Sequence, residues 1–236
     1  MSSPPSSSDA PSPSGGRRPR AVLLDVDGTL VDTAFAHTTC WWQALREHGH
    51  RVPMARIHRA IGLGADRMVG HLLGEHDESI DDAVVASHAA LVAAWHERFV
   101  PLPGARDLVR RCHDAGLVVV LSTSAGTRDL AALRRALDAD DWVDEATTND
   151  DAEHSKPDTD ILDVALDRIG VRAEDAVFVG DAVWDARAAV SAGMPCLGVE
   201  CGGTSAAELT EAGCVATYAD PADLLARFED SALAAR

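Results

Sequence analysis

Lysine is almost absent from this chain of 236 residues, although the sequence contains 21 basic residues. The only lysine is Lys156, and the other basic residues are arginines. Acidic residues number 38, which gives a formal net charge of −17 at pH 7. A surface of this charge repels nucleic acids and anionic membranes, so we expect neither as a partner. Because it also repels anionic substrates, a site for such a substrate needs a local positive centre.

Long apolar runs and paired cysteines are also missing. No apolar run approaches the roughly 18 to 20 residues that a membrane-spanning helix needs. The five cysteines are widely spaced and form no C-x-x-C pair, which argues against a zinc site or a redox motif. Residues 1–19 are rich in Ser, Pro and Gly, so we predict a disordered tail and not a secretory signal. We expect a cytoplasmic protein with reduced thiols.

Short apolar segments alternate with amphipathic segments over most of the chain. Runs typical of strands buried on both faces occupy 21–26, 117–121, 176–179 and 196–199, with a weaker one near 145–148. Helical patterns separate them at 105–115, 128–137, 160–169, 184–192 and 206–212. Repeated strand–helix–strand units predict an α/β fold with a doubly wound parallel sheet.

One interval lacks this alternation. About 70 residues after the first strand show helical patterns, at 35–48, 53–61, 65–73 and 79–98, but no convincing strand. We therefore predict a core domain of residues 20–33 and 101–236, with a helical cap of residues 34–100 inserted into it. Since ligands of open α/β sheets bind beyond the carboxyl ends of the strands, the cap should cover the site as a lid.

The first strand leads into the string D-V-D-G-T-L-V-D-T, residues 25–33. Asp25 and Asp27 point to the same face of an extended chain, and two carboxylates there are costly to desolvate without a cation. Gly28 permits a tight turn, and Thr29 offers a hydroxyl and a backbone N–H to an anion. The alternative is a strand that ends in solvated acids and ordinary turn residues. That alternative suits an isolated D-x-D better than the whole string.

The string resembles the first signature of the haloacid dehalogenase superfamily, D-x-D-G-T-[LV]-x-D-[ST]. The superfamily's second motif is a Ser or Thr at the end of the second core strand, where this chain has Ser122-Thr123-Ser124. The resemblance implies that Thr123 holds a phosphoryl oxygen, with Ser122 as the alternative register. The implied fold is a Rossmann-like sheet of order 3-2-1-4-5.

Two further segments match the same superfamily in the right order. Lys156-Pro157 matches a lysine that precedes a helix, and Gly180-Asp181 with Asp185 matches G-D-x-x-x-D after a strand. A lone lysine between acids is usually a surface residue, and an acid before a helix is often an N-cap. The single lysine of an acidic chain, however, suits the local positive centre anticipated above. A second acidic cluster favours metal ligation.

The resemblance implies a magnesium-dependent phosphatase. Asp25 would be the nucleophile and Asp27 the general acid and base, with charge on the transferring group stabilised by Thr123 and Lys156. The implied Mg²⁺ ligands are the carboxylate of Asp25, the backbone carbonyl of Asp27, and Asp181 and Asp185. The implied phosphate-binding residues are Gly28, Thr29, Thr123, Ser124 and Lys156.

The helical insert resembles the small cap of the phosphoglycolate phosphatase and β-phosphoglucomutase group, which acts on small phosphorylated metabolites. Asp27 argues against the dehalogenase and phosphonate hydrolase branches, which lack this residue. His37, Arg67 and His71 are candidates for substrate selection, although each also suits a surface role. A phosphomutase and a non-catalytic interaction protein remain alternatives, and the chain is expected to be a monomer or homodimer.

Overall fold

The computed structural model describes residues 19–74, 78–152 and 154–234, so the predicted tail lies outside the described residues except for residue 19. Six strands form one parallel sheet of order β3-β2-β1-β4-β5-β6. The strands are β1 Ala21–Leu24, β2 Val118–Ser122, β3 Glu145–Thr147, β4 Ala176–Gly180, β5 Cys196–Val199 and β6 Ala216–Tyr218. The predicted α/β class and the predicted order of the first five strands are confirmed.

The structure differs from the predicted sheet at two places. The edge strand β6 was not predicted, because its three residues carry no extended apolar run. The first strand ends at Leu24 and not at Val26, although the Asp25 N–H still donates to the Val179 carbonyl at 2.9 Å. Beyond that point the chain turns tightly, since the N–H of Val31 donates back to the carbonyl of Val26.

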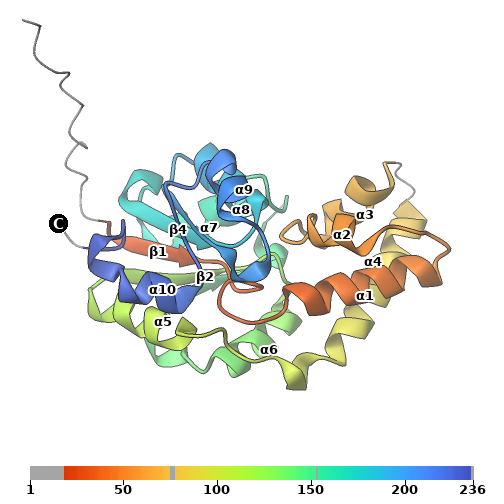
Figure 1. Cartoon of the computed structure of the whole chain (residues 1–236), viewed down its shortest axis with the longest axis horizontal. Helices are drawn as coiled ribbons and strands as arrows, with labels where there is room; N and C mark the ends of the chain where they lie inside the picture. Colours follow the sequence, from red (N-terminus) through yellow and green to blue (C-terminus); the bar gives the residue numbers. More distant parts are fainter. Residues whose placement is uncertain (1–18, 75–77, 153, 235–236) are drawn as a thin grey trace, which may run out of the picture.

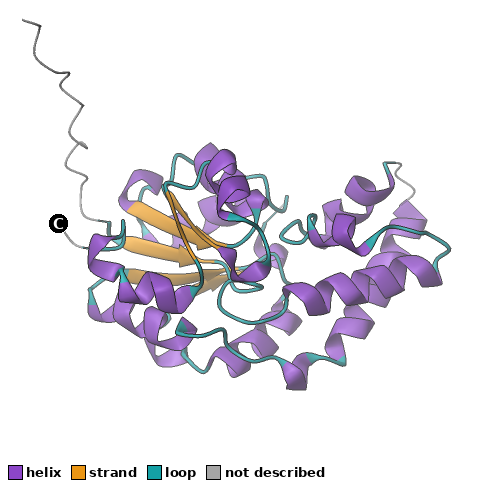
Figure 2. Ribbon diagram, viewed as in Figure 1, coloured by secondary structure: helices purple, strands orange, loops and turns teal. Residues whose placement is uncertain are grey.

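Helices cover both faces of the sheet (Figures 1 and 2). Val22 and Leu24 pack on one face in a cluster with α5 (Ala105–Asp114), α6 (Thr127–Leu137) and α10 (Pro221–Ala226). Ala21 and Leu23 pack on the other face with α7 (Asp160–Ile169), α8 (Val183–Ser191) and α9 (Ala206–Ala212). This alternation of β1 side chains between two apolar layers explains why its sequence is continuously apolar.

A second group of helices lies beyond the carboxyl ends of the strands (Figure 1). It consists of α1 (Ala34–Glu47), α2 (Met54–His58), α3 (Ala65–Leu73), α4 (Glu78–Ala93) and the 3₁₀ turn His96–Arg98. These helices share an apolar cluster of their own, built around Trp41, Ile57 and Met68. The division into core and cap at residues 34 and 100 stays a prediction. Among the described helices, none is long and apolar enough to cross a membrane.

Candidate active site

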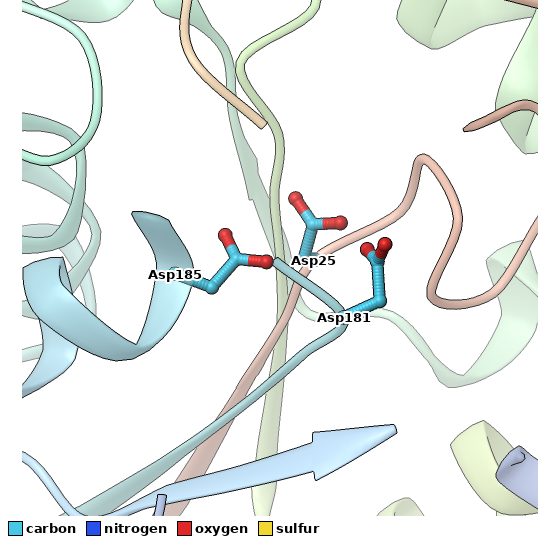
Figure 3. Close-up of side chains that lie close together, drawn as sticks. All are labelled: Asp25, Asp181 and Asp185. Atoms are coloured by element: carbon cyan, nitrogen blue, oxygen red, sulfur yellow. The ribbon is translucent and has the colours of Figure 1, made fainter. Parts of the chain in front are cut away.

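Three carboxylates meet at the carboxyl ends of β1 and β4 (Figure 3). Asp25 follows β1, Asp181 follows β4, and Asp185 lies in the first turn of α8. One carboxylate oxygen from each residue lies within 4.8 Å of the other two, and all three side chains are buried. The adjacency of β1 and β4 in the sheet therefore brings together acids that are more than 150 residues apart in the sequence.

Lys156 is the cation of this cluster. Its Nζ lies 2.7 Å from Oδ1 of Asp25 and 2.8 Å from Oδ1 of Asp185, and it donates to the carbonyl of Ser122 at 3.2 Å. The side chain is completely buried, and Nζ also lies 5.1 Å from the ring centroid of Phe178. The only lysine of the chain is therefore an internal residue, placed against two of the three acids.

Burial shifts the pKa values of Asp25 and Asp181. Burial raises the pKa of Asp25 to about 7, even though Lys156 opposes the shift. Burial, together with the charges of Asp185 and Asp25, raises the pKa of Asp181 well above its ordinary value. Burial would lower the pKa of Lys156, but Asp185 and Asp25 outweigh that effect and raise it. The single ammonium of Lys156 pairs with Asp25 and Asp185, so the raised pKa values favour proton uptake by these acids unless a further cation is bound.

Asp27 has a different environment from Asp25. Its Oδ1 accepts hydrogen bonds from Thr33 Oγ1 at 2.8 Å and faces His37 Nε2 at 3.2 Å, while Oδ2 accepts from Thr123 Oγ1 at 3.1 Å. Burial would raise the pKa of Asp27, but these hydrogen bonds hold it below its ordinary value. Burial opposes protonation of His37, yet its contact with Asp27 raises the pKa of the ring. The two shifts therefore favour an ionised Asp27 beside a protonated His37.

The segment after β1 fits tightly around Asp181. Thr29 is fully buried and donates its hydroxyl to Oδ1 of Asp181 at 3.0 Å. Gly28 has φ +82°, and a Cβ there would lie 2.8 Å from Oδ2 of Asp181; a Cβ on Gly202 would lie 1.7 Å from the same oxygen. Both positions therefore require glycine beside this carboxylate. The Thr29 hydroxyl thus contacts a predicted metal ligand, and phosphate binding by Thr29 stays a prediction.

A cavity of about 270 Å³ opens beside Asp25 and Asp27. The loop residues 123–126 line it on the side of the core, and residues of α1, α3 and α4 line it on the side of the helical insert. Ser124 Oγ donates to the carbonyl of Gly62 at 3.3 Å, which links the second predicted motif to the loop between α2 and α3. Ser122 and Thr123 are both fully buried, but only Thr123 lines the cavity, so Thr123 is the better placed of the two predicted registers.

Only one of the three predicted substrate-selecting residues reaches this cavity. His37 lines it, as described above. Arg67 forms an ion pair with Asp158, and His71 packs edge-on against Trp184 with a centroid distance of 5.2 Å. Neither of these two side chains lines the cavity that holds Asp27.

His88 is a site residue that the sequence analysis missed. Its Nε2 lies 3.2 Å from Nδ1 of His37, and its ring stacks on Trp41 with a centroid distance of 3.9 Å. Burial lowers the pKa of His88 well below its ordinary value, so the ring is neutral. The i, i+4 spacing of His37 and Trp41 on α1 puts both on one helical face, but the sequence carries no signal that α4 brings His88 to them.

Comparison with known proteins agrees with this geometry. Residues 19–193 match the family model described as a haloacid dehalogenase-like hydrolase. The chain is 31% identical over 194 residues to a phosphoglycolate phosphatase of Pseudomonas fluorescens, covering 79% of this chain and 71% of the relative. It is also 31% identical over 219 residues to a phosphoglycolate phosphatase of Rhodospirillum rubrum, covering 87% of this chain and 89% of the relative.

Solved structures agree with the fold. A hydrolase from Pseudomonas syringae superposes with a TM-score of 0.85 at 30% identity, covering 89% of this chain and 98% of that one. A haloacid dehalogenase-like family hydrolase from Streptococcus pneumoniae superposes with a TM-score of 0.72 at 20% identity, covering 89% and 98%, which shows the fold alone. The chain belongs to the haloacid dehalogenase-like hydrolases. The predicted family and the prediction of an enzyme are confirmed.

Proposed function

We propose that this protein hydrolyses small phosphomonoesters with the help of Mg²⁺, through a phosphoryl intermediate on Asp25. The observation that carries the proposal is the position of Asp25. Its carboxylate belongs to the cluster with Asp181 and Asp185, contacts Lys156, and also lines the cavity that contains Asp27. The names of the relatives, phosphoglycolate phosphatases, support the same reaction type.

The three-carboxylate cluster fits a hard divalent cation. Asp25, Asp181 and Asp185 supply only oxygen ligands, and their charge exceeds that of the single ammonium beside them. Mg²⁺ prefers oxygen ligands and usually retains several waters, so three protein carboxylates with the Asp27 carbonyl form a sufficient set. When bound, the ion would neutralise charge on the phosphoryl group and orient it toward Asp25.

The residues of the chain divide the remaining chemistry. Asp25, the nucleophile, forms a bond to phosphorus while the bond to the leaving alcohol breaks. The Asp27–His37 pair donates the proton that the alcohol oxygen takes up, and Asp27 then accepts a proton from the water that hydrolyses the intermediate. Lys156 holds Asp25 in place and offsets negative charge. The hydroxyls of Thr123 and Ser124, which donate to Asp27 and to the Gly62 carbonyl in the structure, would turn to donate to the phosphoryl oxygens. Gly28 leaves room for the carboxylate of Asp181 beside the turn that carries Asp27.

The substrate partner under this proposal is a small phosphorylated metabolite. A cytoplasmic location also stays part of the proposal, supported by the five cysteines, all of which carry free thiols in the structure.

The proposal is tested by phosphate release from a panel of phosphomonoesters, with Mg²⁺ and with a chelator. We expect Mg²⁺-dependent release by the wild type and loss of at least 1,000-fold in kcat for Asp25→Asn, since the nucleophile is removed. Asp167→Asn, an exposed acid on α7, is the matched control and should keep full activity. Full turnover by Asp25→Asn, or equal turnover in the chelator, would exclude this mechanism.

A further inference from the structure

The position of the general acid locates the leaving group of the substrate, provided that the proposed function holds. A general acid must lie within hydrogen-bond distance of the oxygen that it protonates, or reach it through one water. Asp27 lines the cavity of about 270 Å³ and does not line the second cavity described below. The alcohol part of the substrate must therefore occupy the first cavity, and the walls of that cavity decide which alcohols fit.

Apolar side chains form most of those walls. The helices and loops above the sheet contribute Trp41, Ile61, Leu63, Met68, Val85 and Ala89. Trp41, Leu63 and Met68 also belong to the apolar cluster that α1–α4 share, so packing holds these three in position. A hydrated group gains nothing from such a surface, whereas an alkyl or ring substituent does.

The charged groups on the walls are acidic. Beyond Asp25 and Asp27, the cavity is lined by Asp129 and Asp150, and over the described ranges no arginine or lysine lines it. Asp150 accepts hydrogen bonds from the backbone N–H and the hydroxyl of Thr127, at 2.8 and 2.7 Å. These bonds lower the pKa of Asp150, so it carries its negative charge at neutral pH.

Neither histidine on the wall is available to pair with an anion. His37 has both ring nitrogens engaged, Nε2 with Asp27 and Nδ1 with His88. His88 stacks on Trp41 and is neutral, as described above. His96 pairs with Asp129 at 2.9 Å and does not line the cavity.

Arginines line a second cavity instead. Arg59 and Arg187 line a second cavity of about 650 Å³, which contains Asp181 but neither Asp25 nor Asp27. Ile61 lines both cavities and stands between them. An anionic substituent on the leaving group would therefore face Asp129 and Asp150, with no arginine or lysine among the described residues that line the cavity and with His37 already paired with Asp27.

We infer that this site prefers phosphomonoesters whose alcohol part is uncharged and largely apolar, and that it discriminates against alcohols bearing a carboxylate or a second phosphate. Phosphoglycolate, the substrate in the names of the relatives, carries such a carboxylate. The chain would then share the reaction of those relatives but differ from them in substrate class.

The test compares four esters of similar size in the presence of Mg²⁺: 2-phosphoglycolate, 2-hydroxyethyl phosphate, phosphoethanolamine and n-propyl phosphate. We expect kcat/KM for n-propyl phosphate to exceed that for 2-phosphoglycolate by at least about tenfold, because the carboxylate meets like charges in a partly desolvated cavity. A kcat/KM for 2-phosphoglycolate equal to or above that of the uncharged esters would overturn the inference and leave the phosphatase proposal standing. A kcat/KM for phosphoethanolamine above that of both uncharged esters would also overturn it. No release from any ester would overturn the inference and the proposed function together.

A positive charge introduced on the cavity wall provides a second test of the inference. Val85→Lys places a positive charge on the wall, and Val85→Met changes the side chain without adding charge. We expect the Lys variant to raise the ratio of kcat/KM for 2-phosphoglycolate over n-propyl phosphate at least fivefold above that of the Met variant. Ile80→Lys, on the exposed part of the same helix, should leave the ratio at its wild-type value. An unchanged ratio in Val85→Lys would contradict the claim that wall charge sets the preference.

Discussion

Lys156→Met removes the cation that pairs with the buried acids Asp25 and Asp185. The side chain is fully buried, and its Nζ lies within 2.8 Å of both Asp25 and Asp185. Met fills a similar volume, so little cavity forms and the loss is mainly electrostatic. Removing one partner of a buried ion pair typically costs about 3–5 kcal/mol of unfolding free energy. Since a domain has only about 5–15 kcal/mol in total, this variant should be marginally stable.

The loss of unfolding free energy in Lys156→Met should grow with pH. The pKa of Asp25 is raised to about 7 in the folded protein, against 3.8 for the ordinary group. The folded state therefore binds more protons than the unfolded state between these values, and stability falls as pH rises through that window. Without Lys156 the pKa of Asp25 moves higher still and extends the window above pH 7. One extra proton bound by the folded variant gives an added slope of about −1.4 kcal/mol per pH unit relative to the wild type.

The assay is urea unfolding followed by tryptophan fluorescence at pH 6, 7 and 8.5, with and without Mg²⁺. We expect Lys156→Met to lose about 3 kcal/mol of unfolding free energy at pH 6 and about 5 kcal/mol at pH 8.5, relative to the wild type. Saturating Mg²⁺ should narrow the difference between variant and wild type, because a bound cation replaces part of the lost charge. Arg51→Met, at an exposed arginine, should change stability by no more than about 0.5 kcal/mol. If Lys156→Met loses less than about 1 kcal/mol of unfolding free energy at pH 8.5, and the loss does not depend on pH, the electrostatic role of Lys156 is refuted.

Two further predictions concern residues that hold the site in shape. Thr29→Val removes the hydroxyl bond to Asp181 and should raise the Mg²⁺ dissociation constant about tenfold, measured by calorimetric titration. The control Thr39→Val, on the exposed side of α1, should leave that constant unchanged. An equal increase in both variants would contradict the role of Thr29 in orienting Asp181. His88→Ala frees Nδ1 of His37 and should lower kcat about tenfold with KM little changed. His88→Gln should recover part of the lost kcat. A change confined to KM would indicate that His88 contacts the substrate instead.

The sequence was sufficient to predict the residues at the ends of the strands. Asp25, Asp181 and Lys156 each follow an apolar run or precede a helix, and parallel topology brings the ends of neighbouring strands to one edge. Once the order of the strands is known, their meeting follows from backbone geometry. The short edge strand β6 escaped prediction because three residues with mixed polarity give too little periodicity.

The cavity wall could not be predicted in the same way, because its composition depends on how four helices pack and not on where strands end. Arg67 and His71 had the residue types of a substrate-binding site, yet α3 turns the first toward Asp158 and the second toward Trp184. His88 and Val85 face the cavity only because α4 packs across α1. The proposed chemistry therefore depends on the motif residues, whereas the proposed substrate class depends on tertiary contacts that no local pattern encodes. Substitutions such as Val85→Lys should consequently change which ester is preferred while Asp25 and Asp27 keep the same reaction.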